Sequence, residues 1–185
     1  ASVNNTGLIT NSGTGSGGDS ISAVIGTSVT GVVENSTTSS LSLSGANTYT
    51  TGTTVDAGTV IGMSVAANTF GTGTITLGNS AGVSNAATVD VGVTGLTYSN
   101  AIALASTTTG TLTVGNTGTA ISTTFSGGVT GSNNLTINSN ATTGTITFAT
   151  GALNNAGTIT NTGAGSGTTT ISSAVGSNVT GITEN

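Results

Sequence analysis

The segment from Asn4 to Asn35, NNTGLITNSGTGSGGDSISAVIGTSVTGVVEN, occurs a second time from Asn154 to Asn185, as NNAGTITNTGAGSGTTTISSAVGSNVTGITEN. The two copies align without a gap at an offset of 150 residues, and 18 of the 32 paired positions are identical. A closed barrel or sandwich cannot begin a second copy of itself partway along a chain and still bury that fragment, whereas a solenoid simply adds turns. The internal repeat therefore favours a solenoid.

Differences between the two copies keep the chemical character of each position. Val32 becomes Ile182, and Ser12 becomes Thr162. Apolar positions stay apolar and hydroxyl positions stay hydroxyl, as the inward and outward sides of strands require. The substitutions therefore predict strands with one buried side.

Short runs of alternating β-branched residues, separated by Gly and Asn, recur along the chain. Period-two alternation predicts strands, and an apolar stripe at helical spacing is missing throughout. The runs are residues 41–44, 74–77, 111–114, 135–138, 145–148 and 158–160. We predict an all-β fold, a parallel β-solenoid with no significant helix.

The repeat also predicts the organisation of the chain. Residues 1–150 form one full unit of arbitrary phase, and residues 151–185 begin the next copy within a single continuous solenoid. At roughly 20 residues per turn, one unit is expected to contain about seven or eight turns.

Charged residues are scarce and of one sign. The chain of 185 residues has five carboxylates, no Lys, Arg, His or Cys, and a net charge of −5. Binding to nucleic acid is not expected, because phosphate neutralisation needs Lys or Arg. Membrane insertion by this segment is not expected either, since it contains no apolar run of about 18 residues.

Enzymatic activity is not expected from this composition. Without His, Cys, Lys or Arg, the common nucleophile and acid–base arrangements cannot form. Only a carboxylate pair remains, and the acids are far apart in sequence: Asp19, Glu34, Asp56, Asp90 and Glu184. We predict no catalytic residues, no cofactor and no cofactor-binding residues.

A metal site is a minor alternative. Oxygen ligands favour Ca²⁺ over other metals, and Glu34 persists as Glu184 in the second copy, whereas Asp19 is replaced by Thr169. Calcium at Glu34 and Glu184 is one hypothesis. A solvated or turn-capping carboxylate is the alternative.

The stretch from Leu43 to Val60, LSGANTYTTGTTVDAGTV, resembles the autotransporter-associated β-strand repeat of type V secretion passengers. The continuation FGTGTITLGN, at residues 70–79, is similar in style. Thr51 departs from the usual Gly of the family, and Tyr49 is expected in a packed turn. The matching residues are Leu43, Ser44, Gly45, Asn47, Thr48, Tyr49, Gly52, Thr53, Thr54, Val55, Ala57, Gly58 and Thr59.

That resemblance carries expectations about location and role. It implies a right-handed parallel β-helix, exported to the surface of a Gram-negative bacterium and displayed as an adhesin, stalk or fibre. We predict a non-catalytic structural segment of such an extracellular rod. Its partners would be further copies, by head-to-tail continuation or lateral association, and host or abiotic surfaces.

Two other functions stay open at this point. A binding module, either an adhesin or an ice-binding solenoid, could use Thr-x-Thr pairs, but these pairs are unevenly spaced for a flat array with one pair per turn. The pairs are Thr74/Thr76, Thr111/Thr113, Thr145/Thr147 and Thr158/Thr160. Functional amyloid is the third interpretation, because low charge and the absence of Pro suit cross-β stacking.

Overall fold

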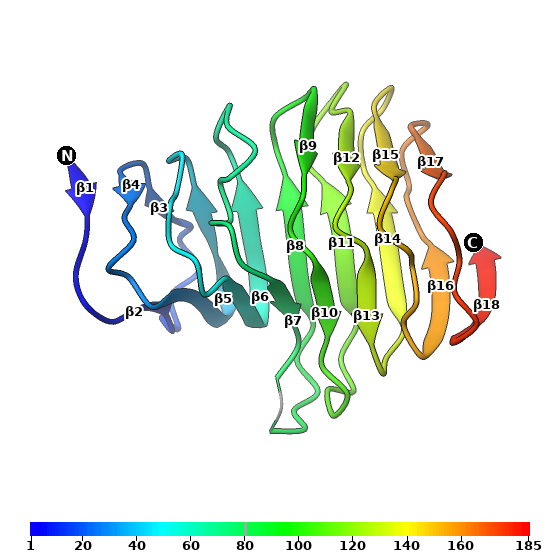
Figure 1. Ribbon diagram of the computed structural model, residues 1–185, viewed down its shortest axis with the longest axis horizontal. Coiled ribbons are helices and arrows are strands. Elements are labelled where there is room, and N and C mark those ends of the chain that lie inside the picture. The colour runs from blue at the N-terminus through cyan, green and yellow to red at the C-terminus, as the bar shows by residue number, and fades with distance from the viewer. Residues whose placement is uncertain (80) are drawn as a thin grey trace.

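The computed structural model describes residues 1–79 and 81–185, which form a parallel β-solenoid of about eight turns with no helix among them. Figure 1 shows the turns stacked side by side along the long axis, with the two termini at opposite ends of the stack. The predicted all-β parallel solenoid is confirmed.

Each turn has three faces, which we name A, B and C. Face A contains β2 (Leu8–Asn11), the first part of β5 (Gly31–Leu43), the first part of β6 (Thr53–Gly62), β7 (Ile75–Leu77), β10 (Ile102–Leu104) and β13 (Val129–Gly131). Face B contains β3 (Asp19–Ile21), the second parts of β5 and β6, β8 (Ala87–Val91), β11 (Leu112–Asn116), β14 (Leu135–Ser139), β16 (Gly157–Asn161) and β18 (Val179–Glu184). Face C contains β1 (Ser2–Val3), β4 (Val24–Ile25), β9 (Leu96–Tyr98), β12 (Thr123–Phe125), β15 (Thr145–Phe148) and β17 (Thr168–Ile171).

Strand alternation decides which side chains enter the core. In β8, Ala87, Val89 and Val91 are buried, whereas Thr88 and Asp90 between them are partly exposed. Successive side chains of a strand point to opposite sides, so the period-two pattern of the sequence becomes an inside and an outside.

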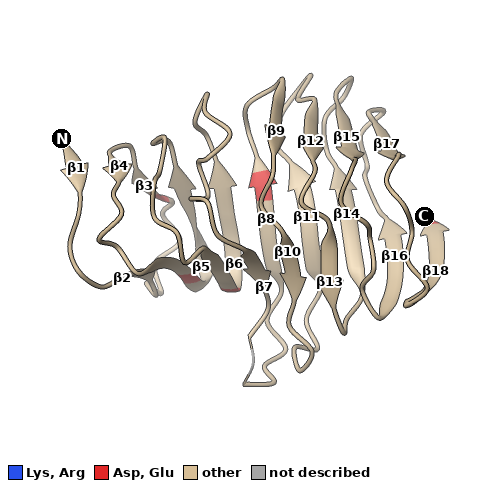
Figure 2. Ribbon diagram, viewed as in Figure 1, with Lys and Arg blue, Asp and Glu red and all other residues tan. Residues whose placement is uncertain are grey.

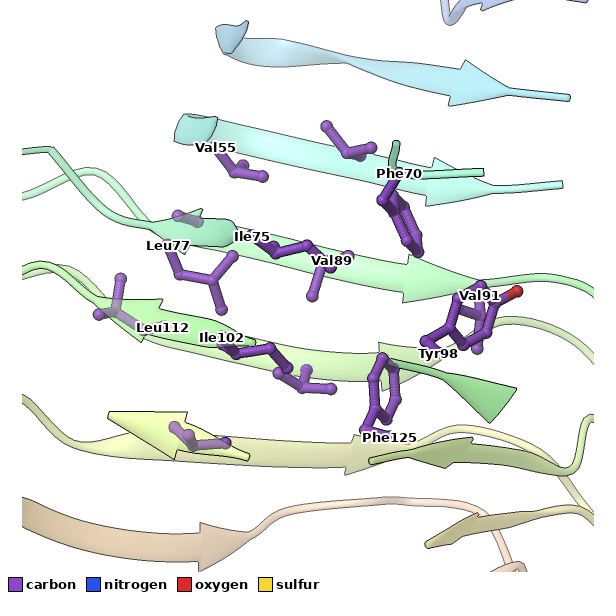
Figure 3. Packing of buried hydrophobic residues seen from close by; sticks show 14 of the residues in the cluster. Val55, Phe70, Ile75, Leu77, Val89, Val91, Tyr98, Ile102, Leu112 and Phe125 are labelled. Carbon is purple, nitrogen blue, oxygen red and sulfur yellow. The ribbon is translucent and has the colours of Figure 1, made fainter. Parts of the chain in front are cut away.

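The core consists of columns in which the same kind of side chain stacks from turn to turn (Figure 3). On face C the rings of Phe70, Tyr98, Phe125 and Phe148 lie 5.4, 5.6 and 5.6 Å apart between successive centroids. Each such pair contributes about 0.5–1.5 kcal/mol beyond its buried area. Face B has an aliphatic column of Leu41, Val60, Val89, Val114 and Ile137, and a second one of Leu135, Ile159 and Ile182 towards the C-terminal end.

The turns are longer than expected and unequal in length. The step from Val32 to its partner Thr53 in the next turn spans fewer residues than the step from Thr59 to its partner Thr88. The corners between faces differ in length while the strands stay in register, because hydrogen bonding constrains only the strands. The expected seven or eight turns per 150 residues was therefore too many, since about eight turns take the whole chain.

One corner shows why glycine is needed at close approaches. Gly58 has a φ of 79°, in the region that only glycine adopts readily. A Cβ atom there would also collide with the carbonyl oxygen of Ser36 in the preceding turn. The glycine lets β6 change direction between faces A and B while it remains against β5.

The two copies of the repeat occupy different faces. Ile9 pairs with Val32 on face A, whereas their equivalents Ile159 and Ile182 pair on face B. Local contacts are nonetheless preserved: the Gly26 N–H donates to the Val3 carbonyl at 2.8 Å, and Gly176 donates to Leu153 at 2.8 Å. The second copy therefore reproduces the packing of the first, one face further round the solenoid.

Candidate functional site

Glu34 is a buried carboxylate whose oxygens both accept hydrogen bonds. The side chain has no exposed surface. Its Oε2 accepts from Asn11 Nδ2 at 2.9 Å, and its Oε1 accepts from the Ser36 N–H at 2.8 Å. Burial raises the pKa of Glu34, the two hydrogen bonds lower it, and the charge of Asp19 raises it slightly. Glu34 therefore joins two turns and holds the bend of β5 between faces A and B, which is a turn-capping role.

Glu184 repeats half of this arrangement at the other end of the stack. Asn161 Nδ2 donates to both of its oxygens, at 3.0 and 2.9 Å, and the side chain is exposed. The two glutamates that suggested calcium therefore do not meet at one site. Among the described residues, no group of three or more His, Cys, Asp or Glu is placed to hold an ion.

The fold brings Asp19 close enough to Glu34 for its charge to raise the pKa of Glu34, although the two residues lie on different faces. The pair does not make a catalytic arrangement, because Glu34 has no surface that a substrate could reach.

Asp90 is the one acidic residue of β8, the strand that carries a red segment on the flank of the rod in Figure 2. It lies on face B between Ile61 and Gly115 in register, and a Cβ atom at Gly115 would collide with its Oδ1. Burial raises the pKa of Asp90 to about 6. Glycine at position 115 makes the space into which this carboxylate leans.

The residues of the family-like motif have structural roles. Asn47 is buried and connects three turns: its Oδ1 accepts from the Ile25 N–H at 2.8 Å, and its Nδ2 donates to the Thr69 carbonyl at 2.5 Å. The Tyr49 side chain is buried, its hydroxyl is 2.6 Å from Thr53 Oγ1, and burial raises its pKa. The packing expected for Tyr49 is confirmed.

Threonines of successive turns form in-register ladders, which the uneven spacing of threonines along the sequence did not reveal. Of the Thr-x-Thr pairs, one lies at face A, two at face B and one on face C, so their uneven spacing reflects different faces and corners rather than a broken array. The face B ladder is in register from turn to turn: Thr59, Thr88, Thr113, Thr136, Thr160 and Thr183. The face C ladder is Thr97, Thr124, Thr147 and Thr170.

The two ladders differ in their electrostatic surroundings. Asp90 lies two residues beyond Thr88 on the outer side of face B. The strands of face C that carry its ladder contain no Asp or Glu. Face C therefore offers the uncharged hydroxyl surface.

Comparison with known proteins gave no assignment: no family model matches the chain, and no curated protein or solved structure matches it significantly. Among the described residues, no helix is long and apolar enough to cross a membrane.

The repeat supplies a matched pair of variants. Glu34→Ala should lower the free energy of unfolding by about 1–3 kcal/mol, because it leaves the buried Ser36 N–H without its acceptor and leaves Asn11 Nδ2 with Ser39 Oγ alone. Glu184→Ala, at the exposed equivalent, should leave stability unchanged. Urea denaturation followed by circular dichroism measures both, and equal effects would contradict the capping role of Glu34.

Stability should rise as the pH falls from 7 towards 4. The pKa of Asp90 is about 6 in the folded chain against an ordinary 3.8, so the folded state holds a proton that the unfolded state releases. Asp90→Asn should therefore stabilise the protein at pH 7, on the order of 1–3 kcal/mol, and should flatten the dependence between pH 4 and 6.

The pKa values of Glu34 and Asp56 are also raised by burial, so part of that pH dependence should remain in Asp90→Asn. Thermal melts across this pH range measure the effect, with Glu184→Gln as the exposed control. A melting temperature of Asp90→Asn that follows the parent at every pH would show that Asp90 is not the group responsible.

Proposed function

We propose that this chain is a non-catalytic rod segment of an extracellular structural protein at a bacterial cell surface, as part of a filament, stalk or adhesin passenger. The observation that carries the proposal is the unbroken stack of about eight parallel turns. At roughly 4.8 Å per turn this makes a rod of about 38 Å. Such a stack supplies length and stiffness.

Three further features support that proposal. Cohesion comes from backbone pairing and apolar columns, which salt does not screen, and the chain has no Lys or Arg to form ion pairs with its carboxylates. The 43–60 segment is similar to autotransporter repeats, which favours export from a Gram-negative cell. Solenoids also extend by adding turns, which suits head-to-tail continuation.

Immunogold electron microscopy of intact cells that make the protein tests this role. Antibodies raised against residues 1–185 should place gold outside the cell envelope and at a distance from it, as a projecting rod requires. Antibody preabsorbed with the purified chain is the control. Gold that appears only after permeabilisation would contradict both the location and the role.

The face C ladder favours a second candidate function, binding to an uncharged, repetitive surface such as ice. Four threonines repeat at the strand spacing of about 4.8 Å, and the rings of Tyr98, Phe125 and Phe148 stack on the inner side of the same strands. Hydroxyl and methyl groups in rows can order water in rows. This function is compatible with the rod and would make it an attachment surface.

Measurements of thermal hysteresis and ice recrystallisation distinguish this candidate. The parent chain should show activity, which Thr124→Lys combined with Thr147→Lys should abolish. The control is Thr54→Lys with Thr76→Lys on face A, where the ladder is interrupted by Ala103. An inactive parent chain would remove ice binding, and equal loss in both variants would remove the assignment to face C.

A further inference from the structure

The C-terminal end of the stack is an open apolar surface. Ile182 is 56% exposed and Val175 is 44% exposed. Beside Ile182 lies a hollow of about 190 Å³, which includes Ile159 and Ile171 in its lining, with the Glu184 carboxylate at its edge. Side chains that are core elsewhere in the rod are uncovered here.

The first copy of the repeat shows what covers the equivalent surface. Val32, the counterpart of Ile182, has no exposure, because Thr53 of the next turn pairs with it. Glu34, the counterpart of Glu184, is closed over by Val55 and receives the N–H of Ser36. The segment that makes this cover is residues 36–62.

We infer that the surface formed by Val175, Ile182 and Glu184 binds a further solenoid turn of the same type as residues 36–62, seated one face further round than in the first copy. This inference rests on the proposed rod function and names the partner of its growing end. Three features of the surface would recognise such a turn: the edge of a parallel strand, an aliphatic column, and the Glu184 carboxylate, which lacks the backbone N–H donor that Glu34 has in Ser36.

The repeat predicts where the parts of that turn would lie. In the first copy Leu43 pairs with Ile21, and the equivalent of Ile21 is Ile171 on face C. The counterpart of Leu43 would therefore cover the hollow beside Ile171. Asn47 Oδ1 accepts from the Ile25 N–H, and the equivalent donor is the N–H of Val175. The side-chain oxygen of the counterpart of Asn47 would accept a hydrogen bond from this N–H.

A strand of the Thr53–Val55 type would then pair with β18. In the first copy the Val32 N–H donates to the Gly52 carbonyl at 3.3 Å, so the Ile182 N–H would gain the corresponding acceptor. The counterpart of Ser36 in the added turn would supply its N–H to Glu184, as Ser36 does to Glu34. Ile182, Val175 and Glu184 would then each have a partner.

The one-face shift has a consequence for a longer array. If each 150-residue unit begins one face later than the unit before it, equivalent features appear on the three faces in succession. A fibre built in this way would present the same surface, including its threonine ladders, on every side.

The test fuses residues 36–62 directly after Asn185. In the fused chain, amide hydrogen exchange at Ile182 should slow by about tenfold or more relative to the 185-residue chain, and the melting temperature should rise. The control fusion has the same length but carries Asn at the four positions equivalent to Leu41, Leu43, Val55 and Val60, so it cannot fill the columns. It should leave Ile182 exchange fast.

Equal exchange at Ile182 in the two fusions would overturn the inference. Protection of Ile182 in the 185-residue chain itself that rises with concentration would show that a second copy occupies the surface, which also overturns it. Neither result depends on where the protein resides, so failure here is distinguishable from failure of the immunogold test.

A second measurement tests the face shift without any fusion. The chain has no cysteine, so two introduced thiols have no competitors. Thr136 and Thr160 are neighbours in register on face B, within the range of a disulfide, and Thr136→Cys with Thr160→Cys should cross-link on oxidation. Thr130→Cys on face A with Thr160→Cys should not, and the reverse outcome would overturn the shift.

Discussion

Parallel pairing of each turn with the next is the constraint on which the rest of this structure depends. Pairing fixes the spacing of turns at roughly 4.8 Å, and register then decides which side chains meet. Valine meets valine on face B, where Val60, Val89 and Val114 follow one another. A side chain at an inward position must therefore pack against its neighbours in both adjacent turns. Differences in the length of the turns occur at the corners, where no register has to be kept.

Buried polar groups in this rod serve the same stacking. Asn47 accepts from one turn and donates to another, and Glu34 is held between Asn11 of the preceding turn and the N–H of Ser36. Each satisfies backbone or amide groups that burial would otherwise leave unpaired. Because these contacts join successive turns, they reinforce the register that the apolar columns establish. The resulting rod depends little on ion pairs.

The flanks and the ends of the stack offer different kinds of surface. Outward positions face fewer packing demands than the core, so they can carry ladders of threonine, or an aspartate such as Asp90 beside a glycine that leaves it room. Face C carries an uncharged hydroxyl ladder over a stack of aromatic rings. The ends of the stack differ from its flanks, since they expose core side chains and strand edges. The proposed extension and the proposed attachment therefore use different surfaces of one rod.

The sequence by itself determined the solenoid, because a restart after 150 residues and period-two strands leave few other folds. It also indicated the structural status of Glu34, which both copies retain, and the packing of Tyr49. Only the tertiary structure decided which strands, and which threonines, share a face. Thr113 and Thr147 look unevenly placed along the chain because they belong to ladders on two different faces. The second copy lies one face further round because the 150 residues of offset do not make a whole number of turns. Strand pattern is a local property that can be read along the chain. The face on which a strand lies depends instead on the summed lengths of all the corners before it.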